Sequence, residues 1–85
     1  MKVKDLIEKL EQVDPEREVI LQKDAEGNGY SPLYGFWEGT YIAKTTWWGE
    51  AWLEELTSDL EHRGGFTEED VRTDGEPAIF LEPIN

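Results

Sequence analysis

The sequence predicts a small α+β domain: an antiparallel sheet of three to four strands, an N-terminal amphipathic helix packed on it, and one or two short helices before the last strand. Three observations support this fold class. Apolar residues near the N-terminus have helical spacing, β-prone segments are separated by turn residues, and the second half holds two helix-capping patterns. Residues 1–85 are assigned to one domain, because a chain of this length builds a single core.

The N-terminal helix is predicted over residues 3–12. Apolar residues recur there at i, i+3, i+4 and i+7, which places them on one helical face, and lysines and acids fill the other face. Asp14 precedes Pro15, and proline biases the residue before it away from helical backbone, so the helix ends there. The apolar positions are Val3, Leu6, Ile7, Leu10 and Val13.

The sheet is predicted from four extended segments. In the first, "EVILQKD", Val19 and Leu21 share one face and Ile20 lies on the other. The second segment is expected to run antiparallel to the first. The last, "PAIFLEPIN", is bracketed by prolines that limit its length. The four segments are residues 18–24, 36–43, 46–53 and 77–85.

Two short helices are predicted before the last strand. Ser58 followed by Glu61 has the spacing of a capping box, so the first helix is expected over residues 58–63. Thr67 at the N-cap with Asp70 at N3 is a variant of the same pattern and predicts one further helical turn.

The tryptophan-rich segment before these helices has a second interpretation. Trp48, Trp52 and Leu56 have helical spacing, so residues 46–56 are either extended or the start of a longer helix. Gly49 and the Thr-Ser pair that follows the segment disfavour a long helix. The extended interpretation is preferred.

The stretch "KDAEGNGYSPL" resembles a ligand loop. Asp24, Glu26 and Asn28 alternate like the first ligands of a calcium loop, but the twelfth position, which should be a bidentate glutamate, is Gly35. The glycines do not open a helix, so phosphate-loop patterns are not met either. We therefore expect a turn whose glycines accept positive φ.

Acidity dominates the composition. Twenty acids against eight bases give a formal net charge of −12, and residues 45–85 hold eleven of the acids and only two of the bases. Such a surface repels nucleic acid and anionic membranes and attracts basic protein surfaces. We expect a protein partner with a basic surface, with no direct nucleic-acid or membrane partner.

Residues for catalysis or metal binding are sparse. The sequence has no cysteine, which excludes thiolate zinc sites, and its one histidine, His62, suits the dipole at a helix C-terminus. Paired acids are abundant, but solvated helix faces explain them without a catalytic cleft. We predict no enzymatic activity, no metal and no cofactor. The charged N-terminus lacks the apolar core of a secretory signal, so a cytoplasmic location is expected.

Several segments together resemble a family of small acidic proteins encoded by tailed phages and prophages. They are "DPEREVILQKDAEGNGYSPL", "LTSDLEHRGGFTEEDV" and the ending "PAIFLEPIN". The resemblance covers nearly the whole chain, with "TTWWGEAWLEE" the least similar part. It implies a phage origin and a shared fold, and it transfers no catalytic residue. The expected partner is therefore a host protein in the bacterial cytoplasm.

Three functions are compatible with these observations. The favoured one is a protein that binds and inhibits a host nucleic-acid-handling or defence protein through an acidic, DNA-mimic-like surface with aromatic anchors. Its predicted partner-binding residues are Trp47, Trp48, Trp52, Glu54, Glu55, Asp59, Glu68, Glu69 and Asp70. The second is a binder of a small nucleotide signal through Asn28, Tyr30, Ser31 and Trp37. The third is a self-associating structural protein whose exposed tryptophans form a homo-oligomer surface.

Overall fold

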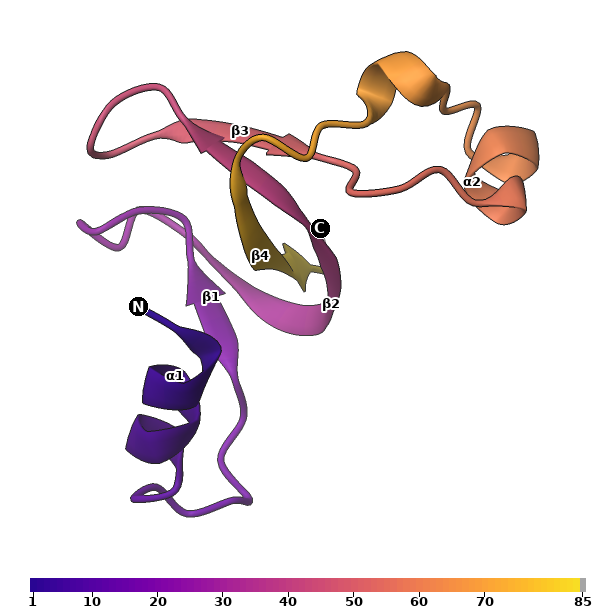
Figure 1. The fold of residues 1–85 in the computed structure, drawn as a ribbon. Helices are drawn as coiled ribbons and strands as arrows, with labels where there is room; N and C mark the ends of the chain where they lie inside the picture. Colours follow the sequence, from indigo (N-terminus) through magenta and orange to yellow (C-terminus); the bar gives the residue numbers. More distant parts are fainter. Residues whose placement is uncertain (85) are drawn as a thin grey trace. The chain divides into compact units, whose positions relative to one another are not determined.

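The computed structural model describes residues 1–84, and its fold is the predicted α+β class (Figure 1). Within these residues, four strands form one antiparallel sheet in which β2 pairs with each of the other three. In chain order the elements are α1 (Val3–Leu10), β1 (Ile20–Gln22), β2 (Tyr30–Ala43), β3 (Gly49–Trp52), α2 (Ser58–Arg63), the single 3-10 turn η1 (Glu68–Asp70) and β4 (Glu76–Pro83).

The register of the sheet follows from two antiparallel hairpins. At the start of β2, Tyr30 lies opposite Gln22 of β1. At its end, Thr40 lies opposite Trp52 of β3, and Ala43 lies opposite Gly49. Exposure alternates along the first nine residues of β2, as expected when one face of a strand is covered and the other faces solvent.

Helix α1 starts where predicted and ends two residues early. The backbone N–H of Lys2 donates to Asp5 Oδ2 at 3.0 Å, which caps the first turn. After Leu10 the chain tightens: the N–H groups of Gln12 and Val13 donate to carbonyls three residues back, at 3.3 and 3.1 Å. These 3-10-type bonds end the α-helix before Asp14-Pro15, so the proline is not the direct stop that the sequence predicted.

Strand β2 begins six residues earlier than predicted. The prediction was wrong here because it placed the stretch that includes Pro32 in the turn before the strand. Pro32 nevertheless pairs with Ile20, its carbonyl accepts from the N–H of Ile84 at 3.1 Å, and Leu33 donates to the carbonyl of Val19 at 3.2 Å. The neighbouring backbone groups therefore keep their hydrogen bonds although proline has no N–H.

The other predicted elements are confirmed with small changes. Within the segment predicted as extended at 46–53, residues 49–52 form β3 and residues 46–48 belong to the turn before it, so the helical alternative is wrong there. Helix α2 covers residues 58–63 as predicted, but its N-cap is Thr57, whose Oγ1 accepts from the N–H of Leu60 at 3.2 Å. Ser58 is the first helical residue and not the cap. Strand β4 contains both of its prolines instead of lying between them.

The second capping pattern is confirmed at η1. Thr67 is the N-cap, its N–H donates to Asp70 Oδ2 at 2.8 Å, and its own hydroxyl accepts from the N–H of Glu69 at 3.3 Å. These two hydrogen bonds stabilise a single short turn, and the chain becomes extended again at Val71.

The chain divides into two compact units. One comprises residues 1–33 with the C-terminal residues from Pro83, and the other comprises Tyr34–Glu82. Apolar packing is sparse throughout the part described: no hydrophobic side chain is fully buried, and only Gly39 and Thr40 are buried residues. The closest aromatic packing lies in the second unit, where Trp37 and Phe80 stack with ring centroids 4.4 Å apart.

Candidate functional site

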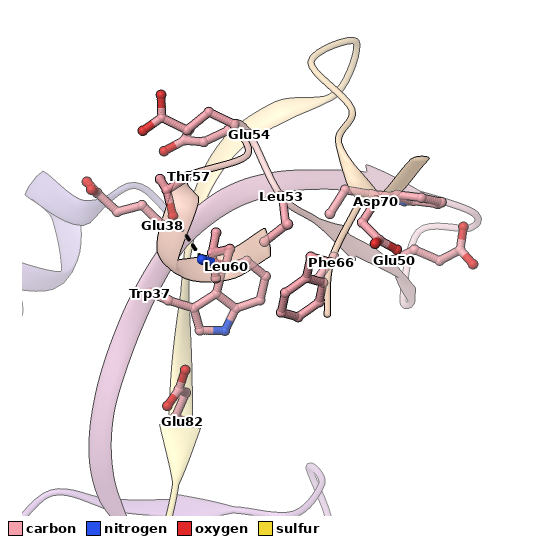
Figure 2. Close-up of a pocket in the computed structure, with 13 residues that line it drawn as sticks. Trp37, Glu38, Glu50, Leu53, Glu54, Thr57, Leu60, Phe66, Asp70 and Glu82 are labelled. Atoms are coloured by element: carbon pink, nitrogen blue, oxygen red, sulfur yellow. Dashed lines mark hydrogen bonds between the residues drawn. The ribbon is translucent and has the colours of Figure 1, made fainter. Parts of the chain in front are cut away.

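The second unit contains an open groove of about 800 Å³, a volume typical of binding sites (Figure 2). We call it the acidic groove. Its apolar floor and acidic rim come from β2, β3, α2, the segments that flank α2, η1 and β4. The lining residues are Trp37, Glu38, Glu50, Ala51, Trp52, Leu53, Glu54, Glu55, Thr57, Leu60, Phe66, Asp70 and Glu82.

Local hydrogen bonds position the floor of the acidic groove. The N–H of Leu53 donates to the carbonyl of Asp70, and the N–H of Arg72 donates back to the carbonyl of Leu53, both at 3.0 Å. This pair ties the end of β3 to η1. The Thr57 cap starts α2 and thereby places Leu60 in the floor. Figure 2 shows Trp37, Leu53, Leu60 and Phe66 grouped together, with carboxylates around them.

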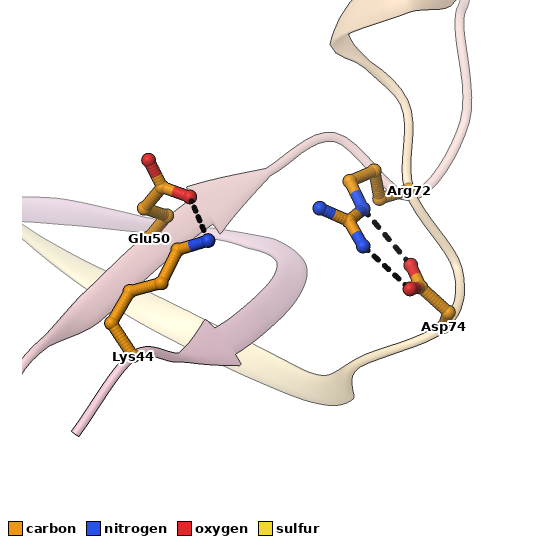
Figure 3. Close-up of polar contacts among 4 residues, drawn as sticks. All are labelled: Lys44, Glu50, Arg72 and Asp74. Atoms are coloured by element: carbon orange, nitrogen blue, oxygen red, sulfur yellow. Dashed lines mark hydrogen bonds and ion pairs between the residues drawn. The ribbon is translucent and has the colours of Figure 1, made fainter. Parts of the chain in front are cut away.

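The rim of the acidic groove is entirely negative among the described residues that line it. Six carboxylates belong to it, and neither lysine nor arginine does. Glu50 is partly neutralised by Lys44, whose Nζ lies 3.1 Å from its Oε1 (Figure 3). Asp70 is engaged in the cap of η1. The remaining four, which form no ion pair within residues 1–84, are Glu38, Glu54, Glu55 and Glu82.

Trp52 forms a cation–π contact with Arg72. The guanidinium of Arg72 lies 5.3 Å from the centroid of the indole, a cation–π distance. Asp74 orients that guanidinium through two hydrogen bonds of 3.0 and 2.6 Å (Figure 3). The same hydrogen bonding keeps the pKa of Asp74 below its ordinary value. The buried Nε1–H of Trp52 finds no acceptor in the described chain, and such a donor is costly unless a partner or water satisfies it.

The predicted partner-binding residues fall into two groups. Trp52, Glu54, Glu55 and Asp70 line the acidic groove. The others lie elsewhere: two tryptophans in the turn between β2 and β3, Asp59 in α2 and two acids in η1. Those outside the groove are Trp47, Trp48, Asp59, Glu68 and Glu69.

The two tryptophans of the β2–β3 turn are solvent-exposed. Trp47 is 81% exposed and Trp48 45%, and their ring centroids are 6.4 Å apart. In α2, Asp59 pairs with Arg63 at 3.1 Å on a strongly exposed surface. Their role in partner binding stays a prediction.

Sequence reasoning missed most of the groove floor. Leu53, Leu60 and Phe66 were assigned no binding role, and Trp37 was assigned to a different ligand. Their apolar character is visible in the sequence, but their convergence is not, because it depends on the pairing of β2 with strands that come much later in the chain. The high density of acids around residue 54 was the one usable signal.

The alternative ligand residues do not share one compact unit. Asn28, Tyr30 and Ser31 belong to the first unit and Trp37 to the second. In the first unit their polar groups are occupied locally: the Asn28 amide donates to Asp24 Oδ2 at 3.0 Å, and the Ser31 hydroxyl donates to the carbonyl of Pro32 at 3.1 Å. Tyr30 and Ser31 also line a smaller hollow of about 460 Å³.

The loop between β1 and β2 is the expected turn. Gly27 has φ +75°, the left-handed backbone that glycine adopts without strain. Asp24 Oδ1 accepts from the N–H of Glu26 at 2.9 Å and from that of Asn28 at 3.3 Å. The carboxylate thus organises the turn in the manner of an Asx motif.

Asn28→Ala is expected to raise the pKa of Asp24. In the folded chain this pKa lies below its ordinary value of 3.8, chiefly because the Asn28 side chain donates to the carboxylate. A lowered folded-state pKa stabilises the turn at pH values above the unfolded pKa, and this contribution is lost as the pH falls through the folded pKa. A carboxyl-detected NMR titration measures the shift. Ser31→Ala is the matched control, and an Asp24 pKa that is identical in the Asn28 variant and the wild type contradicts the assignment.

The potential metal ligands of the chain are its acidic side chains and His62. Within residues 1–84, no group of three or more histidine or acidic side chains is placed to hold a metal ion. His62 lies in the last turn of α2. None of the helices in that part is long and apolar enough to cross a membrane.

Comparison with known proteins yields no match: no family model fits the chain, no curated protein matches its sequence, and no solved structure matches its fold.

Proposed function

We propose that this protein is a non-enzymatic binding protein whose acidic groove captures a basic, amphipathic segment of a partner protein. The observation that supports this most directly is the composition of the groove, an apolar floor inside a rim of six carboxylates. A segment with apolar residues on one side and lysine or arginine beside them matches both features. Nucleic acid matches neither, because its phosphates would meet the carboxylates.

The floor supplies contact area and the rim supplies orientation and steering. Leu60 and Phe66 project toward the groove from a capped helix and the segment after it, so an apolar side chain of the partner displaces water there. The unpaired rim carboxylates, among them Glu54 and Glu55, raise the local concentration of cationic partners. Binding should therefore be strong at low salt and weaker at high salt.

The resemblance to phage proteins makes a bacterial host protein the expected partner, met in the host cytoplasm. Proteins that handle nucleic acid, including defence nucleases, carry basic surfaces that bind phosphates. Occupying such a surface with carboxylates would inhibit the host protein by keeping its nucleic acid out. The acids of α2 and η1 extend the negative surface beyond the groove, and Trp47 and Trp48 add exposed aromatic anchors.

The test compares two synthetic amphipathic helices of the same length, one of leucine and lysine and one of leucine and glutamate. Calorimetry and tryptophan fluorescence should show that the lysine peptide binds, more weakly as salt increases, while the glutamate peptide does not. Duplex DNA should not bind directly. Equal binding of both peptides, or of neither, contradicts the proposal.

The inhibitory part of the proposal needs a host target. A pull-down from bacterial lysate at low salt, followed by elution with duplex DNA, tests it. A nucleic-acid-handling protein released by DNA is expected. If captured proteins leave only with detergent and not with DNA or salt, acidic mimicry is wrong.

A further inference from the structure

The Trp37 ring is held in the floor of the acidic groove by close packing. It stacks on Phe80, with ring centroids 4.4 Å apart and an angle of 27° between the two planes. Gly39 approaches it so closely that a Cβ there would lie 2.6 Å from the ring carbon Cζ3. The indole is therefore fixed before any partner binds, and it stays half-buried with part of its surface lining the groove.

Glu82 is the rim acid that gains most from a cationic partner. Of the four rim carboxylates that form no ion pair in the described chain, Glu82 is half-buried and the other three are exposed. A partly desolvated carboxylate attracts a cation more strongly than an exposed one does, because less water screens the pair. Strand β4 carries Glu82, and Figure 2 shows its carboxylate turned toward the Trp37 ring.

The same unit already holds a cation with this combination of groups. The guanidinium of Arg72 lies 5.3 Å from the centroid of the Trp52 ring, and Asp74 accepts two hydrogen bonds from it (Figure 3). An indole and a carboxylate thus bind one guanidinium, by stacking and by a two-point hydrogen bond. Trp37 and Glu82 present the same two groups to the groove, whose lining contains neither lysine nor arginine.

A guanidinium suits these two groups better than an ammonium does. It is planar, so it lies flat on an aromatic ring, and its N–H groups match the two oxygens of a carboxylate. It is also more weakly hydrated than an ammonium, so placing it against an apolar floor costs less free energy. Lysine supplies the same charge but neither the flat stack nor the two-point hydrogen bond.

We propose that the acidic groove selects arginine: one arginine side chain of the partner segment stacks on the Trp37 ring while Glu82 binds its guanidinium. This inference rests on the proposed function and deepens it, because it names the partner residue that is recognised. The exposed rim carboxylates attract any cation, whereas Trp37 and Glu82 distinguish one cation from another. Glu82 is therefore a specificity-determining residue of the groove.

Two amphipathic helical peptides test this selectivity. One is the leucine–lysine peptide, and in the other every lysine is replaced by arginine. Calorimetry at one physiological salt concentration should give a dissociation constant about tenfold lower for the arginine peptide, the gain expected from one stack and one additional hydrogen bond. Equal affinities, or tighter binding of the lysine peptide, overturn the selectivity and leave the proposed function standing. If neither peptide binds, both proposals are wrong.

Glu82→Gln tests the part assigned to the carboxylate. Glutamine keeps the size of the side chain and removes the charge that receives the guanidinium, so the preference for the arginine peptide should fall to below about threefold, the part left to the stack. Glu55→Gln is the matched control, because it removes one charge from the exposed rim of the same groove. It should weaken both peptides alike and retain the preference. A preference that survives in the Glu82 variant, or falls equally in both variants, overturns the assignment.

Proton NMR of the bound arginine peptide tests the aromatic part without altering the protein. Stacking should move the δ-methylene protons of at least one arginine upfield, because an aromatic ring current shields groups that lie over its face. These protons should also show nuclear Overhauser contacts to the Trp37 ring. Unchanged shifts, or contacts only to another tryptophan, overturn the stack on Trp37.

Discussion

Gly39→Ala is expected to destabilise the protein by about 1–3 kcal/mol, the usual cost of overpacking a tight site. A Cβ at this position would lie 2.6 Å from the Trp37 ring, 2.6 Å from the carbonyl oxygen of Trp52 and 3.1 Å from the Phe80 ring. The carbonyl belongs to the backbone of β3 and cannot rotate away. Relief therefore requires separating β2 from β3 or breaking the aromatic stack.

Gly35→Ala is the matched control for this prediction. Gly35 lies in the same strand, and a Cβ there meets nothing within 4 Å. Its replacement should change stability by less than about 1 kcal/mol and can be stabilising, since alanine loses less chain entropy on folding. Thermal unfolding at one fixed protein concentration measures both variants, with about 4–8 °C expected per kcal/mol. Equal melting temperatures for the two variants would contradict the prediction that a Cβ at Gly39 clashes with Trp37 and with the backbone of β3.

The double variant Glu54→Gln, Glu55→Gln is expected to weaken binding of the leucine–lysine peptide by about five- to tenfold at low salt, from two exposed charge interactions. Both side chains line the acidic groove and form no ion pair within the described residues. Glutamine keeps the size of each side chain and removes only its charge. The fold should therefore be retained, and most of the loss should disappear at high salt.

The double variant Glu68→Gln, Glu69→Gln is the control that distinguishes direct contacts in the acidic groove from attraction by the net charge of the protein. These acids lie in η1, outside the groove lining, and their replacement changes the net charge by the same amount. With both pairs compared at the same physiological salt concentration, a smaller loss than for the groove pair is expected, because these carboxylates do not line the groove and act only through a field that is screened over about 8 Å. If the η1 pair weakens binding as much as the groove pair, net charge alone drives association and the groove is not the site.

Local patterns determined most of the secondary structure in advance. The spacing of Val3, Ile7 and Leu10 located α1, the Thr67–Asp70 pair located η1, and the glycines after Asp24 located the turn. Each of these signals acts within a few residues, through a capping bond, a helical face or a permitted φ, so the sequence contains it directly. Composition likewise determined the net charge, from which the sequence predicted a basic partner.

Only the tertiary structure decided which side chains meet. Strand β2 extends back through Pro32 because pairing with β1 and β4 satisfies its backbone, which no local propensity records. The pairing of Thr40 with Trp52 and the bonds between Leu53 and η1 bring the floor of the acidic groove together. Long-range pairing of this kind depends on the whole set of strands at once, and for that reason the sequence could indicate an acidic, aromatic surface but not the groove itself.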